Sequence, residues 1–176
     1  GVTLDMLQDD PIDPPAPIIM LDPPDHTAMR KMVNRTFTPR RMAQLETRVH
    51  QLCEQYLDEF VGSGGFDYVR DFSMRLPVMV ISSLLGFPES DHDLLREWTD
   101  AQIHREPDNP NLTAEGAEAL VQLTGYYGDQ IRRRREHPTD DIVSDLIGAE
   151  LVEPDGTVRH LDDGELIMFI VLINLA

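Results

Sequence analysis

Apolar residues recur at helical spacing along most of the chain, and this pattern predicts a mainly α-helical protein. The predicted helices cover residues 23–36, 39–61, 69–85, 91–103, 114–135, 140–147 and 163–176, and Pro77 breaks or restarts the third. Two short extended pieces, 151–152 and 157–158, flank a turn and predict one small β-hairpin. Prolines make residues 1–20 irregular, and a polar loop follows the fourth helix.

Small polar residues stand where several of these helices begin. Ser, Thr, Asp and Asn side chains can accept a hydrogen bond from the free N–H groups of a first helical turn. The first, fourth, fifth, sixth and last helices are therefore predicted to be capped by Asp22, Ser90, Thr113, Thr139 and Asp162. Basic residues 132–135 end the fifth helix, where they complement the negative end of the helix dipole.

Length and composition are those of one compact domain, with 176 residues of which 41% are hydrophobic. The formal net charge of −17 disfavours nucleic acid and anionic membrane surfaces as partners. Cys53 is the single cysteine, so an internal disulfide is excluded and a reducing compartment is expected. No N-terminal signal peptide is visible.

The two ends of the sequence suggest a piece of a longer protein. The chain begins with Gly1 and ends inside an apolar run that starts at residue 166. A transmembrane span would need about 20 apolar residues. The shorter run is better explained as a buried central helix, so no membrane partner is expected.

A histidine and an arginine share one face of the first predicted helix. His26 and Arg30 are one helical turn apart, and Val33 and Phe37 continue that face. The pair is either a solvated basic patch or a clamp for an anion. Arginine offers a planar fork for a carboxylate, and the histidine can donate to a second one. A metal site is disfavoured, because arginine is not a ligand and no second histidine shares the face.

The sequence around this pair resembles the C-helix signature of bacterial cytochrome P450 enzymes. The resembling stretch reads Leu-Asp-Pro-Pro-Asp-His-Thr-Ala-Met-Arg over 21–30 and Phe-Thr-Pro-Arg over 37–40. Three further stretches resemble the family's E helix, the junction of its G and H helices and the start of its I helix; they are residues 76–88, 133–146 and 161–169. The resemblance covers nearly all of residues 1–176 and implies a partial cytochrome P450 domain: helices C to I with a small β-hairpin.

This resemblance implies a function and a cofactor. His26 and Arg30 would bind the two propionates of haem b. The whole enzyme would be an oxidoreductase, a haem-thiolate monooxygenase of the bacterial cytoplasm. It would take electrons from a ferredoxin-type donor, activate O2 and insert one oxygen atom into a hydrophobic organic substrate.

Residues of the substrate pocket are also implied. Ile19 would line the pocket ahead of the C helix, and Leu172, Leu175 and Ala176 would face the space above the haem. The small side chain of Ala176 would leave room there for oxygen and substrate. Plain core packing would explain the same apolar positions. Residues 106–112 would form the lid between the F and G helices.

Important parts of the family's pattern are missing from the sequence. Ala176 would be the first residue of the family's oxygen-handling motif, and the loop with the iron-ligating cysteine is absent. Cys53 cannot replace that cysteine, because it lies within the second helix as a small hydrophobe. The segment therefore contains no metal ligand and no catalytic residue, and alone it is expected to be inactive. An all-α interaction or ligand-binding module without chemistry is the alternative.

Basic residues gather in one part of this acidic chain. Residues 30–48 contain six basic residues and one acidic residue. A solvated helix face would explain them. The functional alternative is a docking patch for an acidic electron donor, formed by Lys31, Arg35, Arg40 and Arg41.

Overall fold

The computed structural model describes residues 15–175, and these residues are mainly helical. The α-helices are α1 (Asp25–Val33), α2 (Pro39–Asp58), α3 (Arg75–Leu84), α4 (His92–Ile103), α5 (Ala114–Glu136), α6 (Ile142–Gly148) and α7 (Asp163–Leu175). Short 3-10 turns at Ile18–Met20 and Glu89–Asp91 and a π-helical segment at Tyr68–Ser73 complete the helical elements. Strands β1 (Leu151–Val152) and β2 (Val158–Arg159) pair antiparallel. None of the helices in this range is long and apolar enough to cross a membrane.

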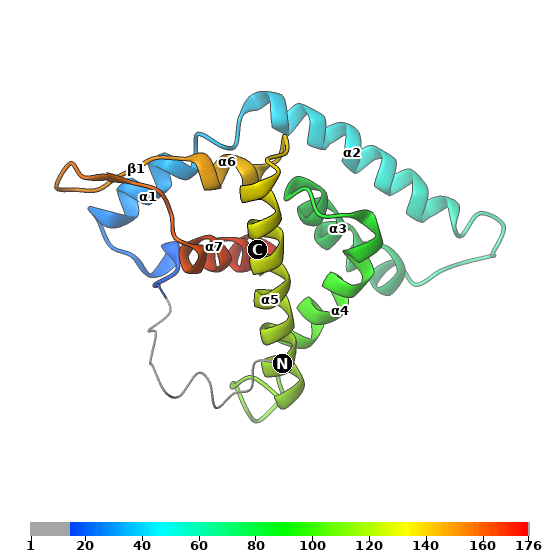
Figure 1. The fold of residues 1–176 in the computed structure, drawn as a ribbon. Helices are drawn as coiled ribbons and strands as arrows, with labels where there is room; N and C mark the ends of the chain where they lie inside the picture. The colour runs from blue at the N-terminus through cyan, green and yellow to red at the C-terminus, as the bar shows by residue number, and fades with distance from the viewer. Residues whose placement is uncertain (1–14, 176) are drawn as a thin grey trace.

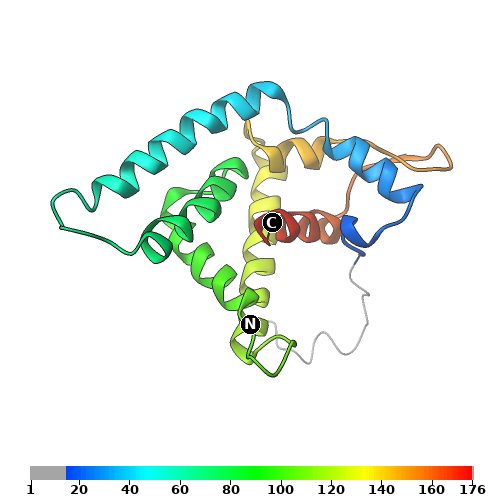
Figure 2. The same ribbon diagram turned by 180° about the vertical axis from the view of Figure 1, so that it is seen from behind.

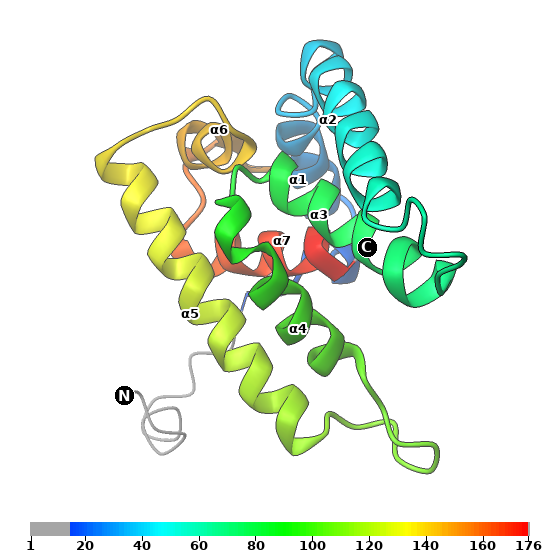
Figure 3. The same ribbon diagram turned by 90° about the vertical axis from the view of Figure 1, so that its right-hand side faces the viewer.

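Helix α5 is the axis of the molecule, and α7 crosses it near its middle (Figure 1). Helices α1 and α6 and the hairpin lie on one side of α5, whereas α2, α3 and α4 lie on the other side (Figures 1 and 2). Helix α4 runs beside α5 (Figure 3). The first and last described helices, α1 and α7, therefore come close although they are far apart in the sequence.

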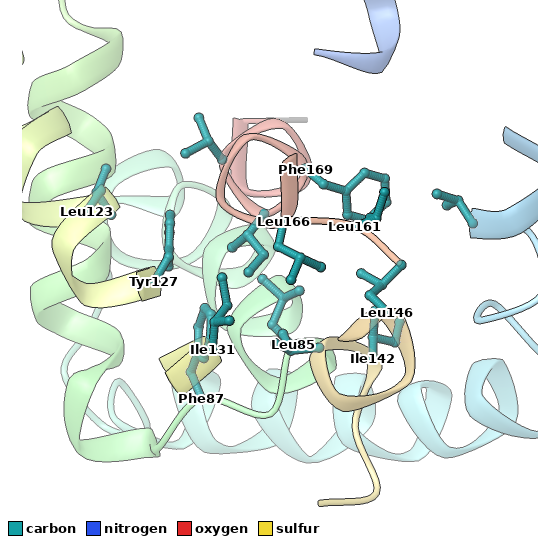
Figure 4. Packing of buried hydrophobic residues seen from close by; sticks show 14 of the residues in the cluster. Leu85, Phe87, Leu123, Tyr127, Ile131, Ile142, Leu146, Leu161, Leu166 and Phe169 are labelled. Atoms are coloured by element: carbon teal, nitrogen blue, oxygen red, sulfur yellow. The ribbon is translucent and has the colours of Figure 1, made fainter. Parts of the chain in front are cut away.

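The main core lies where α5, α6 and α7 meet (Figure 4). Tyr127 and Ile131 of α5 and Leu166 and Ile170 of α7 have no exposed surface. Met32 and Val33 connect α1 to the same cluster. Helix α7 supplies apolar residues on several faces, because it is covered by α3, α4 and α5 at once. This central burial confirms the expectation from its apolar run, in which Asn174 is the one polar residue between 166 and 175.

Two of the predicted helix caps are present. Thr113 accepts a hydrogen bond from the Gly116 N–H (3.0 Å). At the start of α7, the Glu165 N–H donates to Asp162 Oδ1 (2.8 Å) and the Asp162 N–H donates to Glu165 Oε2 (3.0 Å). This reciprocal pair is a capping box, which satisfies two backbone donors that the helix itself leaves free.

Three predicted caps were wrong. Helix α1 begins behind Pro24 without a side-chain cap, so Asp22 does not cap it. Ser90 lies within a 3-10 turn, and its hydroxyl bonds to Asp91 instead. Asp141 caps α6 by accepting from the Ser144 N–H (2.8 Å), whereas Thr139 donates its hydroxyl to that carboxylate (2.6 Å) and its N–H to Ser144 Oγ (3.0 Å). In each case the α-helix begins two or three residues after the predicted cap.

The third predicted helix consists of two elements. The π-helical segment ends at Ser73, and α3 begins at Arg75. Pro77 lies in the first turn of α3, where a missing N–H costs no intrahelical hydrogen bond. The restart expected at the proline therefore occurs a few residues ahead of it.

Candidate functional site

Helix α1 carries the two cations that the sequence singled out. Met32 and Val33 are 2% and 8% exposed and point into the main core. His26 is half-buried, and Arg30 is exposed. At roughly 100° per residue, both lie on the flank of the buried face of α1. The prediction that the pair shares the apolar face is thus half right: the pair borders the core without entering it.

Neither side chain of this pair has a partner in the described part of the protein. Within residues 15–175, the side chains of His26 and Arg30 form no hydrogen bond and no ion pair. Many other arginines do have carboxylate partners, for example Arg159 with Glu153 and Glu165 (both 2.6 Å). In a chain with 32 acidic residues, this pair is still available for an anion from outside the described residues.

Apolar side chains are exposed near the end of α7 and ahead of α1. Leu172 is half-buried and Leu175 is 42% exposed, whereas Ile19 in the turn before α1 is 68% exposed. Ala176 lies outside the described residues. A small cleft where the turn before α1, α1 itself and the first half of α7 meet is lined by Ile18, Met29, Met168 and Phe169, with Glu165 at its edge. Ile19, Leu172 and Leu175 do not line this cleft, and their place in a substrate pocket stays a prediction.

The four predicted docking residues divide into two kinds. Lys31, Arg35 and Arg40 are exposed. The side chain of Arg41 is only 14% exposed and contacts Asp145 (2.7 Å) and Asp140 (3.2 Å), so it joins α2 to the region of α6. Because its guanidinium already forms ion pairs with these carboxylates, Arg41 is not part of a free basic surface.

Lys31 and Arg35 face away from the His26–Arg30 pair. They line a groove between α1 and the hairpin, together with Val152. Helical geometry places Lys31 away from His26 and Arg30 around α1, and Arg35 follows in the turn after the helix. Lys31 and Arg35 are therefore separate from the His26–Arg30 pair.

Sequence reasoning missed two buried polar contacts. Arg134 is 6% exposed and its Nε donates to Asp141 Oδ2 (2.7 Å), although the run 132–135 suggested only a helix end whose basic residues complement the helix dipole. Asn174, which is 7% exposed, donates from Nδ2 to Thr99 Oγ1 (2.6 Å). An asparagine within an otherwise apolar run was the signal that could have indicated the second contact.

No cluster of three or more histidine, cysteine, aspartate or glutamate side chains in residues 15–175 could hold a metal ion. Cys53 is a half-buried free thiol within α2.

The chain was compared with known proteins to find its relatives. No protein-family model matches the chain. The chain is 36% identical over 159 residues to the putative cytochrome P450 123 of Mycobacterium tuberculosis, covering 90% of this chain and 38% of that protein. It is 34% identical over 172 residues to the vitamin D(3) 25-hydroxylase of Pseudonocardia autotrophica, covering 98% of this chain and 40% of that protein.

The solved structures that resemble this fold are also cytochromes P450. CYP109E1 from Bacillus megaterium in complex with corticosterone matches with a TM-score of 0.79 and 32% identity, covering 92% of this chain and 42% of that chain. The structure of cytochrome P450 TbtJ1 matches with a TM-score of 0.79 and 35% identity over the same shares of the two chains. The chain thus spans about 40% of the length of the proteins that it matches.

The fold is a partial cytochrome P450 fold. The chain corresponds to a segment of the bacterial cytochromes P450, and this confirms the predicted family and the predicted mainly helical fold class.

Proposed function

We propose that this chain is the part of a haem-thiolate monooxygenase that binds the haem propionates and forms one wall of the substrate pocket. The observation that carries the proposal is the pair His26 and Arg30 on α1, whose side chains form no hydrogen bond or ion pair within residues 15–175; their helix neighbour Met29 lines a small cleft against α7. The whole enzyme acts in the bacterial cytoplasm. It uses electrons from a redox partner to insert one oxygen atom from O2 into an organic substrate.

The residues present fit haem b, the cofactor of the family. A haem carries two carboxylates on one edge and is otherwise apolar. Arg30 offers a bidentate fork to one propionate, and His26 donates a ring N–H to the other. Leu172 and Leu175 supply apolar surface for the macrocycle and the substrate. When haem is bound through a cysteine thiolate, its iron activates O2.

The apolar residues of the two segments define the class of substrate. Ile19, Leu172 and Leu175 leave hydrophobic surface uncovered. Burial of apolar surface would stabilise a bound hydrophobic molecule by roughly 25 cal/mol per Å². We therefore assign a hydrophobic substrate to this wall and assign residues 106–112 as its lid.

The exposed basic residues from the end of α1 to the start of α2 form the proposed surface for the electron donor, which we take to be a ferredoxin. Lys31, Arg35 and Arg40 are exposed cations on a chain whose net charge is −17. A local patch of positive charge attracts an acidic partner and raises its association rate. Arg41 contributes through its ion pairs with the region of α6, which hold α2 in place.

The test is the haem content of the complete protein that carries this chain. The variant His26→Ala/Arg30→Ala should lower the haem-to-protein ratio, because both propionates lose their donors. The matched control is Arg40→Ala/His50→Ala, which removes the same two residue types from exposed positions of α2. The control should keep the haem content of the unmodified protein.

Two results would contradict the proposal. Equal haem content in both double variants would show that the α1 pair binds another anion. A reduced, CO-bound protein without the red-shifted Soret band of a thiolate-ligated haem would contradict the monooxygenase assignment and favour a non-catalytic module.

A further inference from the structure

One buried hydrogen bond joins α7 to α4. Asn174 Nδ2 donates to Thr99 Oγ1 (2.6 Å), and both residues are buried, with exposed fractions of 7% and 4%. Asn174 is the only polar residue between 166 and 175. A buried polar group in an apolar interface costs free energy unless it is paired, so the pairing favours one alignment of the two helices.

Thr99 and Asn174 differ in how far their hydrogen-bonding groups depend on each other. The Thr99 hydroxyl donates its own hydrogen to the Leu95 carbonyl (2.7 Å), so it stays satisfied without the asparagine. Asn174 depends on Thr99, because its Oδ1 has no partner among the described residues. Loss of Thr99 would leave the whole amide buried and unpaired, whereas loss of Asn174 would leave no buried group unpaired.

The bond lies close to the segment that we assign as a lid. Thr99 lies one helical turn before the end of α4 at Ile103, and the exposed loop 104–113 follows directly. Leu175, next to Asn174 on α7, belongs to the proposed pocket wall. A shift of α4 along α7 would therefore move the loop relative to that wall.

We propose that Asn174 is a positioning residue: its bond to Thr99 fixes α4 against α7 and thereby restrains the 104–113 loop over the substrate pocket. This inference rests on the proposed function for the pocket and adds a residue that controls access to it. Asn174 acts through Thr99 and need not touch the substrate.

Thermal unfolding of the holoprotein tests whether Asn174 depends on Thr99 for its hydrogen bond more than Thr99 depends on Asn174. Thr99→Val should lower Tm by several degrees, because it leaves both amide atoms of Asn174 unpaired. Asn174→Leu should leave Tm unchanged or higher, and Thr99→Val/Asn174→Leu should return to the value of Asn174→Leu. The matched control is Thr124→Val on α5, whose hydroxyl donates to Leu120 O (2.9 Å) and has no partner on another helix within residues 15–175.

Ligand access tests the positioning role. The rate constant for 4-phenylimidazole binding to the haem iron, followed by the shift of the Soret band, should rise at least about fivefold in Asn174→Leu, the low end of coupling between sites. Amide hydrogen exchange should accelerate over residues 99–113 and stay unchanged in α6. A purely structural packing role would change neither measurement in a variant that keeps its Tm.

Failure of the proposed function can be distinguished from failure of the positioning role. A protein without the haem–CO band contradicts the proposed function, while the Tm and exchange measurements still test the α4–α7 bond. Azole binding with equal rate constants in Asn174→Leu and the unmodified protein overturns the positioning role. A Tm for Thr99→Val equal to that of Thr124→Val shows that Asn174 does not depend on Thr99.

Discussion

Arg134 and Asp141 form a buried ion pair that joins the end of α5 to the start of α6, with Nε and Oδ2 2.7 Å apart. The guanidinium also donates to the Gly86 carbonyl (2.7 Å) and to Gln130 Oε1 (2.6 Å), so it reaches the segment after α3 as well. Gly86 has a φ of +72°, and a Cβ there would lie 2.4 Å from Asp141 Oδ2. The glycine therefore permits both the turn and the close approach of the carboxylate.

Removal of the arginine is expected to be strongly destabilising. Arg134→Met leaves a carboxylate buried without its charge partner, which typically costs about 3–5 kcal/mol. Denaturant unfolding of the protein, followed by circular dichroism, measures the loss. The comparison is Arg132→Met, whose exposed pair with Asp129 should contribute no more than about 1 kcal/mol. Equal losses in the two variants would contradict the structural role of the buried pair.

The same carboxylate gives the stability a pH dependence. Burial raises the pKa of Asp141, but hydrogen bonds from Thr139, the Ser144 N–H and Arg134 outweigh it and lower the pKa below the ordinary 3.8. Because the folded-state pKa is the lower one, the contribution is fully present above pH 3.8 and is lost as the pH falls through the folded-state value.

Asp141→Asn isolates that contribution, since asparagine keeps the cap of α6 but cannot ionise. The difference in unfolding free energy between the unmodified protein and this variant should be constant from pH 7 to about pH 5 and should shrink at lower pH. A difference that grows on acidification would mean that the pKa of Asp141 is raised in the folded protein.

The helix caps differ in their expected contributions. Thr113→Ala removes the acceptor for the Gly116 N–H and should cost about 0.5–2 kcal/mol. Ser90→Ala should change the stability by no more than about 0.5 kcal/mol, because Ser90 lies outside α4 and caps no N–H group. Chemical unfolding measures the loss of unfolding free energy in both variants. A larger loss for Ser90→Ala than this limit would show that the serine does cap a helix.

Charge reversal tests the proposed surface for the electron donor. Lys31→Glu/Arg35→Glu should lower the association rate constant of a ferredoxin by about 10-fold or more at low salt, and the difference should decrease at high salt. Stopped-flow reduction of the haem measures the rate. The control Arg132→Glu/Arg133→Glu introduces the same charge change at the exposed end of α5. Equal slowing by both variants would mean that net charge, not the patch, determines the rate.

The sequence was most informative where a local pattern suffices. Helical spacing predicted all seven α-helices, and the turn at 153–156 predicted the hairpin with a one-residue difference in its second strand. Thr113 and Asp162 were recognisable as caps, because a cap is formed by residues three apart along the chain. The family was recognisable from the spacing of His26, Arg30 and the Phe-Thr-Pro stretch that follows them.

Long-range pairings were not predictable in this way. Arg41 belonged by sequence to a basic run, yet it contacts two carboxylates about 100 positions away. Arg134 looked like its three solvated neighbours, and only the packing of α5 against the segment after α3 buries it. Helical spacing predicts which residues share a face of a helix, but it does not predict which segment covers that face.

The sequence by itself determined the helices, the family and the two cations on α1, because these depend on residues within a few turns of one another. The tertiary structure alone decided which charges are buried and which remain available for a partner. It leaves Arg30 without a partner in the described chain, pairs Arg134 with Asp141 and joins Asn174 to Thr99. Burial and ion pairing depend on distances between segments, and those distances exist only after the helices have packed.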